Sequence, residues 1–301
     1  MEAHFPDACS AGCAEDGRVT CTTCFRHCTL AEGQTGFCHG RMNRNGQIVC
    51  SNYGLVTALA LDPIEKKPLA RFRPGSRILS VGSFGCNLRC PFCQNDSISC
   101  ADQNTVHTEY ISPEELCRLA VRERARGNIG AAFTYNEAMI GWEYVRDCAK
   151  LIHEAGLVSV LVTNGCVGHD ALLKVLPWID AMNIDLKSIS PEVYRDTLGG
   201  SLAMTQDFIR MAVRSCHVEL TELIVPGMND SDEEMEELCR WIASLHPGTQ
   251  DQPDGADLPL HISRFFPRHD WRDREPTPVR TIYHLAAIAG RTLRYVYPGN
   301  C

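Results

Sequence analysis

Residues 77–95 read RILSVGSFGCNLRCPFCQN. The first part, RILSVGSFG at 77–85, is an apolar stretch that ends in glycine, which predicts a buried strand. The second part places Cys86, Cys90 and Cys93 in the following loop with the spacing C-x3-C-x2-C. Three thiolates in one short loop suit an iron–sulfur cluster. A four-iron cluster needs four ligands, so three leave one iron open to another molecule, whereas structural zinc sites are closed.

Strands and helices alternate along the chain beyond residue 77. Continuous apolar strands separated by amphipathic helices indicate a parallel sheet covered by helices, which is an α/β fold. Six βα units and one additional strand are too few for a closed eightfold barrel, which leaves a partial barrel or a doubly wound open sheet. In both folds the C-terminal ends of the strands carry the chemistry. We expect strands at 77–85, 131–136, 158–165, 180–187, 217–227, 258–267 and 291–299.

Capping residues mark the ends of the predicted helices. Ser112 and Glu115, with Pro113 between them, form a capping box that predicts a helix over 112–127. The next helix is expected to stop at Gly156, because glycine commonly follows the last helical residue.

Composition restricts the class of protein. The chain has 301 residues and a net charge of −8, which argues against broad binding to nucleic acid or to anionic membranes. It has no apolar run near the roughly 20 residues of a membrane helix, and residues 1–17 lack the basic and apolar regions of a secretory signal. Its 17 cysteines are an odd number, which excludes complete intramolecular pairing. We therefore expect a cytoplasmic protein with reduced cysteines, several of which bind metal.

A second set of cysteines lies before the alternating region, in a polar segment with little periodicity. Its pattern is C-x2-C-x3-C-x9-C, and its members are Cys21, Cys24, Cys28 and Cys38. Four soft ligands within 18 residues suit either a tetrahedral zinc site or a second iron–sulfur cluster, and the sequence does not separate the two. We expect residues 1–75 to form a Cys-rich N-terminal segment with short strands, and residues 76–301 to form the core domain.

Polar side chains follow several later strands, at the edge where the cysteine loop is expected. Asp185 and Lys187 are two residues apart and therefore point to the same side. An inward acid and base are costly unless they pair with each other or with a charged ligand, so they form a structural ion pair or part of a binding site. The other candidates are Asn136 and Glu137 after the second strand, Thr163 and Asn164 after the third, and His261 on the sixth. Structural alternatives exist for these too: Glu137 can begin a helix, and His261 can be a satisfied structural residue.

The C-x3-C-x2-C spacing, with the aromatic Phe92 before the third cysteine, resembles the motif of the radical S-adenosylmethionine (radical SAM) superfamily. The resemblance implies a partial (β/α)6 TIM-like barrel in which Cys86, Cys90 and Cys93 hold a [4Fe–4S] cluster. It also implies a reaction, in which S-adenosylmethionine chelates the open iron through its amino and carboxylate groups. An electron from the reduced cluster then cleaves the sulfonium C–S bond, and the resulting 5′-deoxyadenosyl radical abstracts hydrogen from a substrate.

The same resemblance implies which residues contact S-adenosylmethionine. The residues after the second strand lie where the superfamily usually has a Gly-Gly-Glu run that receives the methionine amino group, although this chain lacks the glycines. The turn at 163–165 and the Asp-x-Lys of the fourth strand resemble segments of glycyl-radical-enzyme activases. Phe92 is expected near the adenine, and His261 is preferred to His269 as the polar residue of the sixth strand. The expected cofactor-binding set is Phe92, Asn136, Glu137, Thr163, Asn164, Asp185, Lys187 and His261.

One group within the superfamily shares more of these motifs. The N-terminal cysteine tetrad is followed by DPIEKKPL (62–69), FRPGS (72–76), GCNLRCPFCQN, FTYNE, TNG, NIDLK and VPGMNDS. Together, over roughly residues 20–300, they resemble the radical SAM enzyme of the AmmeMemoRadiSam system, often labelled as similar to pyruvate formate-lyase activating enzyme. The resemblance implies Memo-like and AMMECR-like proteins as partners, and flavodoxin or ferredoxin as a low-potential electron donor.

The sequence therefore predicts a radical SAM enzyme, with oxidoreductase-like chemistry and an unknown small-molecule or protein substrate. No group at a strand end selects between a sugar, a peptide, a lipid or a nucleotide. Two alternatives stay open. A glycyl-radical-enzyme activase would act on a backbone glycine of another protein. A non-catalytic iron–sulfur electron carrier or sensor would normally bind its cluster through four protein ligands.

Overall fold

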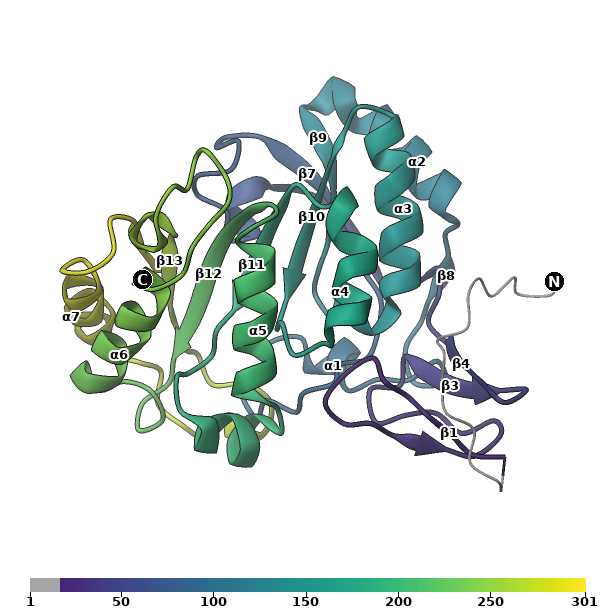
Figure 1. Ribbon diagram of the computed structural model, residues 1–301, viewed down its shortest axis with the longest axis horizontal. Helices are drawn as coiled ribbons and strands as arrows, with labels where there is room; N and C mark the ends of the chain where they lie inside the picture. The colour runs from purple at the N-terminus through teal and green to yellow at the C-terminus, as the bar shows by residue number, and fades with distance from the viewer. Residues whose placement is uncertain (1–16) are drawn as a thin grey trace.

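An eight-stranded sheet forms the centre of the computed structural model, which describes residues 17–301 (Figure 1). Its strand order is β14-β13-β12-β11-β10-β9-β7-β6. β6 is antiparallel to β7, and the other neighbouring pairs of this sheet are parallel. The strands are β6 (Ala58–Pro63), β7 (Arg77–Gly82), β9 (Asn128–Phe133), β10 (Val158–Thr163), β11 (Ala181–Asp185), β12 (His217–Ile224), β13 (Leu260–Arg264) and β14 (Val296–Gly299).

The strand order runs in one direction from β7 to β14 without reversing. A doubly wound sheet reverses at a switch point, so the observed order supports the partial barrel. The connecting helices, among them α3, α4 and α5, lie along one side of the sheet in Figure 1. They are α2 (Pro113–Arg122), α3 (Trp142–Glu154), α4 (His169–Val175), α5 (Leu202–Ala212), α6 (Asp232–Ala243) and α7 (Val279–Ala289). The predicted mostly parallel α/β fold is confirmed, and no helix within residues 17–301 is long and apolar enough to cross a membrane.

The strands from β7 to β12 are mostly buried on both faces, as inner parallel strands in this fold must be, whereas the edge strands β6 and β14 are partly exposed. The outer face packs against the helices in the main hydrophobic core. On the inner face, near the N-terminal ends of the strands, Val158 and Ala181 belong to a smaller cluster with Ile64 and Leu69. The latter two belong to residues 64–72 between β6 and β7, which we call the interior segment. This segment fills the part of the barrel interior that lies away from the strands' C-terminal ends.

The helix that was predicted over 112–127 begins as expected. Ser112 Oγ accepts a hydrogen bond from the backbone N–H of Glu115 at 3.2 Å. The regular helix is shorter than the prediction, and a 3-10 turn completes the stretch. The last strand is also shorter than the predicted 291–299, because the backbone N–H groups of residues 290–293 still donate to carbonyl groups of α7.

The N-terminal segment forms small antiparallel pairs beside the barrel. β1 (Val19–Thr20) pairs with β2 (Thr29–Leu30), β3 (Arg41–Arg44) with β4 (Gln47–Cys50), and β5 (Leu55–Val56) with β8 (Glu109–Tyr110). A buried ion pair joins this segment to α3, since Nη1 of Arg41 donates to both carboxylate oxygens of Glu143 at 2.7 Å. Cys9 and Cys13 lie outside the described residues, and the domain division at residue 75 stays a prediction.

Glu143→Ala should destabilise the protein by about 3–5 kcal/mol, because it leaves the guanidinium of Arg41 buried without its partner. The side chains of Arg41 and Glu143 are only 2% and 1% exposed. Denaturant-induced unfolding of the variant and the wild type measures the difference. Asp196→Ala is the control and should leave the unfolding free energy almost unchanged, since its pair with Arg195 is exposed. Equal stabilities of the two variants would contradict the prediction.

Candidate active site

A cavity of about 560 Å³ opens at the C-terminal ends of the parallel strands. Every residue that the sequence predicts for the catalytic cluster or for S-adenosylmethionine lines this cavity. They are Cys86, Cys90, Phe92, Cys93, Asn136, Glu137, Thr163, Asn164, Asp185, Lys187 and His261. The parallel order brings the ends of separate strands to one edge of the sheet, which explains why residues so far apart in the sequence meet here.

The three cysteines of the motif lie in the loop between β7 and the short helix α1 (Asp96–Ser99). Cys86 Sγ accepts hydrogen bonds from the backbone N–H of Leu88 at 3.4 Å and from Nδ2 of Asn164 at 3.7 Å. Desolvation raises the pKa of Cys86, and it raises the pKa of Cys90 to about 12. Because thiols must lose their protons to bind iron, cluster binding at this loop releases protons.

The donor set fits a four-iron cluster better than a single metal ion. Across residues 17–301, no three side chains of His, Cys, Asp or Glu lie close enough together to hold one ion. A [4Fe–4S] cluster binds each thiolate through a different iron atom, so its ligands lie farther apart than those of one ion. Three cysteines line one cavity here, with N–H donors beside the Cys86 sulfur, and they are the thiolates available to such a cluster.

Gly85 fixes the position of the cysteine loop. Its φ is +87°, a left-handed conformation that glycine adopts without steric cost. A Cβ atom at this position would lie 2.1 Å from the carbonyl oxygen of Cys38 in the N-terminal segment. The loop therefore packs directly on the Cys-rich segment, and a larger residue does not fit between them.

Asn136 braces the same loop from the end of β9. Its Oδ1 accepts a hydrogen bond from the backbone N–H of Ser83 at 3.0 Å, and its Nδ2 donates to the carbonyl oxygens of Phe84 and Gly85 at 3.0 and 3.1 Å. The side-chain amide is thus engaged in positioning the residues before Cys86. The expected contact of Asn136 with S-adenosylmethionine stays a prediction.

Tyr135, which the sequence did not single out, takes the left-handed conformation that a glycine would adopt easily. Its φ is +74°, which is costly for a bulky residue. The Tyr135 hydroxyl donates to Oδ2 of Asp62 at 2.8 Å, and Nζ of Lys67 donates to the same oxygen at 2.9 Å. Nζ of Lys67 also lies 4.6 Å from the centre of the tyrosine ring. These contacts fix the side chain of Tyr135 beside the cavity, where it keeps a backbone conformation that is costly for its residue type.

Glu137 organises the turn that follows β10. Its carboxylate accepts hydrogen bonds from the backbone N–H of Met139 at 3.1 Å, the hydroxyl of Thr163 at 2.6 Å and the backbone N–H of Asn164 at 2.7 Å. The first of these bonds caps the 3-10 helix Ala138–Gly141, so Glu137 does begin a helix, as one alternative expected. Burial raises the pKa of Glu137, although the three hydrogen bonds oppose the rise.

Asp185 and Lys187 form an ion pair on the cavity wall. Nζ of Lys187 donates to Oδ2 of Asp185 at 2.8 Å, which confirms that both side chains point to the same side. Burial lowers the pKa of Lys187, but the Asp185 carboxylate and the Cys90 sulfur outweigh burial and raise the pKa above its usual value. The side chain of Asp185 is 32% exposed, so its carboxylate stays accessible to a ligand.

Two residues of the predicted set have partners that the sequence did not indicate. The buried ring of Phe92 contacts Trp271, with ring centres 5.4 Å apart. Nε2 of His261 lies 2.7 Å from Oε2 of Glu219 on β12. Both partners come from distant parts of the chain, where no local pattern distinguishes them from ordinary loop and strand residues.

The second cysteine set lines a separate small cavity together with Arg41. Its four cysteines are Cys21, Cys24, Cys28 and Cys38. Arg41 is 1% exposed, and within the described residues its Nε and Nη2 atoms have no hydrogen-bond partner. Buried guanidinium N–H groups need an acceptor, and a negatively charged group is the strongest one available. The unpartnered donors therefore mark this cavity as suited to an anionic group.

Comparison with known proteins places these features in a family. Residues 80–242 match the model of the radical SAM superfamily. An uncharacterized protein of Methanocaldococcus jannaschii is 36% identical over 288 residues, which cover 95% of this chain and 82% of that protein. The pyruvate formate-lyase 1-activating enzyme of Escherichia coli K12 is 28% identical over 207 residues, which cover 66% of this chain and 78% of that enzyme.

Solved structures agree on the fold. SuiB of Streptococcus suis, in a crystal structure bound to S-adenosylmethionine, superposes with a TM-score of 0.53 and 10% identity. The match covers 72% of this chain and 48% of that chain, and at this identity it shows the fold alone. Together with the cysteine loop and its cavity, the family match and the archaeal relative give the identification: the chain belongs to the radical SAM superfamily and is an enzyme that uses a [4Fe–4S] cluster and S-adenosylmethionine.

Proposed function

We propose that Cys86, Cys90 and Cys93 hold the [4Fe–4S] cluster and that the cavity beside them binds S-adenosylmethionine and the substrate. The observation that carries this proposal is the convergence of polar strand ends with the cysteine loop on one cavity of about 560 Å³. A cavity of this volume accommodates a ligand of the size of S-adenosylmethionine.

The residues of the chain bind and orient the cofactor. When bound, the cluster supplies the electron that cleaves S-adenosylmethionine, and the radical so formed abstracts hydrogen from the substrate. Asp185 offers a carboxylate to the N–H groups of the methionine amine and Lys187 offers an ammonium to the methionine carboxylate, so the pair can exchange its own contact for contacts with the ligand. Glu137 and Asn136 hold the turn and the loop that face the ligand, and Phe92 offers its ring to the adenine.

We also propose that the protein is the radical SAM component of an AmmeMemoRadiSam system. The support is the motif set that runs from the N-terminal tetrad through DPIEKKPL at 62–69 and beyond. Two residues of DPIEKKPL, Asp62 and Lys67, hold Tyr135 at the cavity wall, so this motif serves the site. Memo-like and AMMECR-like partners, a flavodoxin or ferredoxin as electron donor, and an oxidoreductase-like reaction belong to this proposal.

A glycyl-radical-enzyme activase is the second candidate. The 28% identity to the Escherichia coli activating enzyme favours it, as do the turn at 163–165 and the Asp-x-Lys of β11. An activase needs a protein substrate with a reactive glycine, so formation of a glycyl radical on a partner protein would distinguish it. The electron-carrier alternative is not retained, since the family is one of enzymes.

For the N-terminal tetrad we propose a separate metal–thiolate centre. Its four cysteines line one cavity with Arg41, whose Nε and Nη2 atoms have no acceptor within the described residues. A negatively charged centre bound there would accept from these N–H groups, while Nη1 keeps its pair with Glu143. Four thiolates can hold either zinc or a second iron–sulfur cluster. Within residues 17–301 no three of these side chains lie close enough together to hold one ion as they stand, so zinc would require them to converge. Metal analysis separates the two.

Replacing Cys86, Cys90 and Cys93 together by alanine should abolish the formation of 5′-deoxyadenosine, because the catalytic cluster then has no protein ligand. The assay uses anaerobically reconstituted protein, a chemical reductant and S-adenosylmethionine, with the nucleoside measured by liquid chromatography. Cys117→Ala is the control, because this half-buried cysteine lies on α2 and should leave turnover unchanged. Turnover by the triple variant at the wild-type rate would overturn the assignment.

Lys187→Ala and Asp185→Ala should each weaken binding of S-adenosylmethionine while the cluster stays intact. Removing one partner of a largely buried pair costs about 3–5 kcal/mol, divided between ligand affinity and protein stability. Calorimetric titration of the cluster-loaded variants gives the affinity, and thermal unfolding gives the stability. Asp207→Ala breaks an exposed pair with Arg210 and should change neither. A folded variant with wild-type affinity would show that the Asp185–Lys187 pair is structural.

Cys24→Ala combined with Cys28→Ala should remove either one zinc or about four irons per chain while the spectrum of the catalytic cluster persists. The physical reason is that the two cavities are separate and share no cysteine. Elemental analysis of the variant beside the wild type identifies the metal. If both proteins carry the same metals in the same amounts, the tetrad is not a metal site.

A further inference from the structure

Glu219 on β12 is a buried carboxylate that reaches His261 from the interior of the barrel. Its side chain is fully buried and surrounded by four nitrogen atoms. The backbone N–H groups of Ala70 and Arg71 in the interior segment each donate to it at 2.8 Å. Nε2 of His217 lies 3.0 Å from Oε1, and Nε2 of His261 lies 2.7 Å from Oε2.

These contacts keep Glu219 ionised and fix the tautomer of His261. Burial raises the pKa of Glu219, but the hydrogen bonds from His217 and His261 outweigh it and lower the pKa to about 2. An ionised carboxylate only accepts hydrogen bonds, so neutral His261 carries its proton on Nε2 and leaves Nδ1 as an acceptor. Within the described residues, no group of the chain donates to that Nδ1, and His261 lines the active-site cavity.

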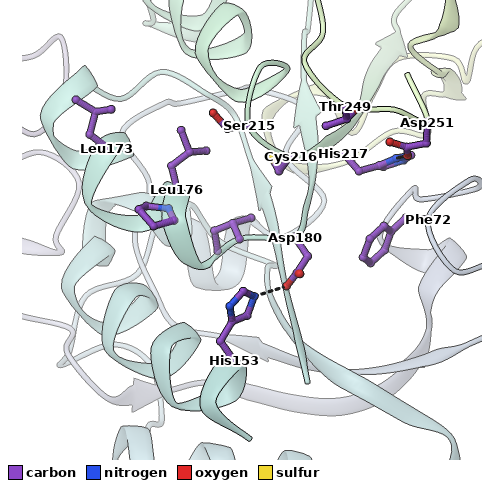
Figure 2. Close-up of a pocket in the computed structure, with 12 residues that line it drawn as sticks. Phe72, His153, Leu173, Leu176, Asp180, Ser215, Cys216, His217, Thr249 and Asp251 are labelled. Atoms are coloured by element: carbon purple, nitrogen blue, oxygen red, sulfur yellow. Dashed lines mark hydrogen bonds and ion pairs between the residues drawn. The ribbon is translucent and has the colours of Figure 1, made fainter. Parts of the chain in front are cut away.

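His217 continues these contacts to the opposite end of the barrel. Its Nδ1 lies 2.5 Å from Oδ2 of Asp251, and both residues line a second cavity of about 600 Å³ (Figure 2). Burial lowers the pKa of His217, but its bonds to Glu219 and Asp251 outweigh burial and raise the pKa. The side chain of Asp251 is 59% exposed, so the series Asp251–His217–Glu219–His261 runs from solvent to the active site.

Other charged or titratable groups near this series are Arg71 and Tyr297, the pair Asp185–Lys187 in the active-site cavity, and the pair His153–Asp180 in the second cavity. Each of the two pairs is satisfied internally, at 2.8 and 2.9 Å. The guanidinium of Arg71 lies over the ring of Tyr295, and Tyr297 stacks on His261. Among residues 17–301, the charges in direct contact with this series are therefore its own members.

We propose that Glu219 is a positioning residue that holds His261 with its Nε2–H toward the barrel interior and its Nδ1 toward the cavity, where Nδ1 accepts a hydrogen bond from a hydroxyl or amino group of S-adenosylmethionine. His217 and Asp251 support Glu219 from the other side. This inference rests on the proposed cofactor site. Because Nδ1 accepts only in the neutral imidazole, the affinity for S-adenosylmethionine falls as the pH drops and His261 gains a second proton.

Glu219→Gln tests the inference, since the carboxamide keeps the shape of the side chain. With its oxygen toward Arg71 and His217, its NH2 group can donate to Nε2 of His261 and so permits the other tautomer, although the backbone N–H of Ala70 then loses its acceptor. At mildly alkaline pH the affinity for S-adenosylmethionine should fall about five- to tenfold, the contribution of one hydrogen bond. The fall in affinity at acidic pH should begin at a lower pH than in the wild type, because the imidazolium of His261 has lost its anionic partner, Glu219. Calorimetric titration of cluster-loaded protein across a series of pH values measures both effects.

Glu222→Gln is the matched control. Glu222 lies on the same strand and is equally buried, and burial raises its pKa well above the usual value, so the amide replaces a neutral acid. This variant should keep the wild-type affinity at every pH.

Asp251→Asn is a second variant at an exposed position, which removes a partner of the His217 cation. Without Asp251, His217 loses its positive charge more readily and no longer offsets the negative charge of Glu219. That negative charge then favours protonation of His261, so the fall in affinity at acidic pH should begin at a higher pH than in the wild type.

Opposite shifts in Glu219→Gln and Asp251→Asn support the inference. A wild-type affinity and pH profile in Glu219→Gln, or shifts of both variants in the same direction, would overturn it. If Glu219→Gln does not retain the iron content of the wild type, Asp251→Asn decides alone, and an unshifted profile then overturns the inference. Failure of the wild-type protein to bind S-adenosylmethionine would instead overturn the proposed function, and the inference with it.

Discussion

Hydrogen bonds between the interior segment and the inward-facing polar side chains of the sheet decide where the barrel is filled and where it is hollow. Asn183 donates to the carbonyl oxygen of Pro68 at 2.9 Å, and Glu219 accepts from the next backbone N–H groups of the segment. Without these partners the barrel interior would contain unpaired polar groups, which cost several kcal/mol each. Because the segment fills one end, the remaining space at the C-terminal ends of the strands becomes the active-site cavity.

The cysteine loop illustrates how irregular backbone is held at such a site. The loop gains little support from sheet pairing, so side chains from neighbouring strand ends replace it. Asn136 binds the residues before Cys86, and Glu137 binds the turn that presents Asn164. Asn164 in turn donates to the Cys86 sulfur. The polar residues at the strand ends are thus preorganised by one another before any ligand arrives.

The sequence predicted the strand ends well, because alternating apolar strands and helices have a recognisable period and a parallel sheet brings every strand end to one edge. It therefore located Asp185 and Lys187 on a common wall. It did not predict contacts between distant segments. Tyr135 depends on Asp62 and Lys67 of another segment, and no residue propensity indicates a tyrosine with positive φ.

The same limit applies to Glu219. It lies in the middle of an apolar strand, where the alternation of side chains gives no sign that a carboxylate is surrounded by four nitrogen donors. This arrangement depends on tertiary contacts that a periodic pattern does not encode.

The close approach of Gly85 to the carbonyl oxygen of Cys38 limits how this architecture can be recombined in evolution or in chimeras. The fit depends on a missing Cβ atom on one side and on a backbone oxygen on the other. No side-chain change in the N-terminal segment can make room for a larger residue at position 85. The Cys-rich segment and the cysteine loop are therefore exchangeable between proteins only as a matched pair, although more than forty residues separate them in the sequence.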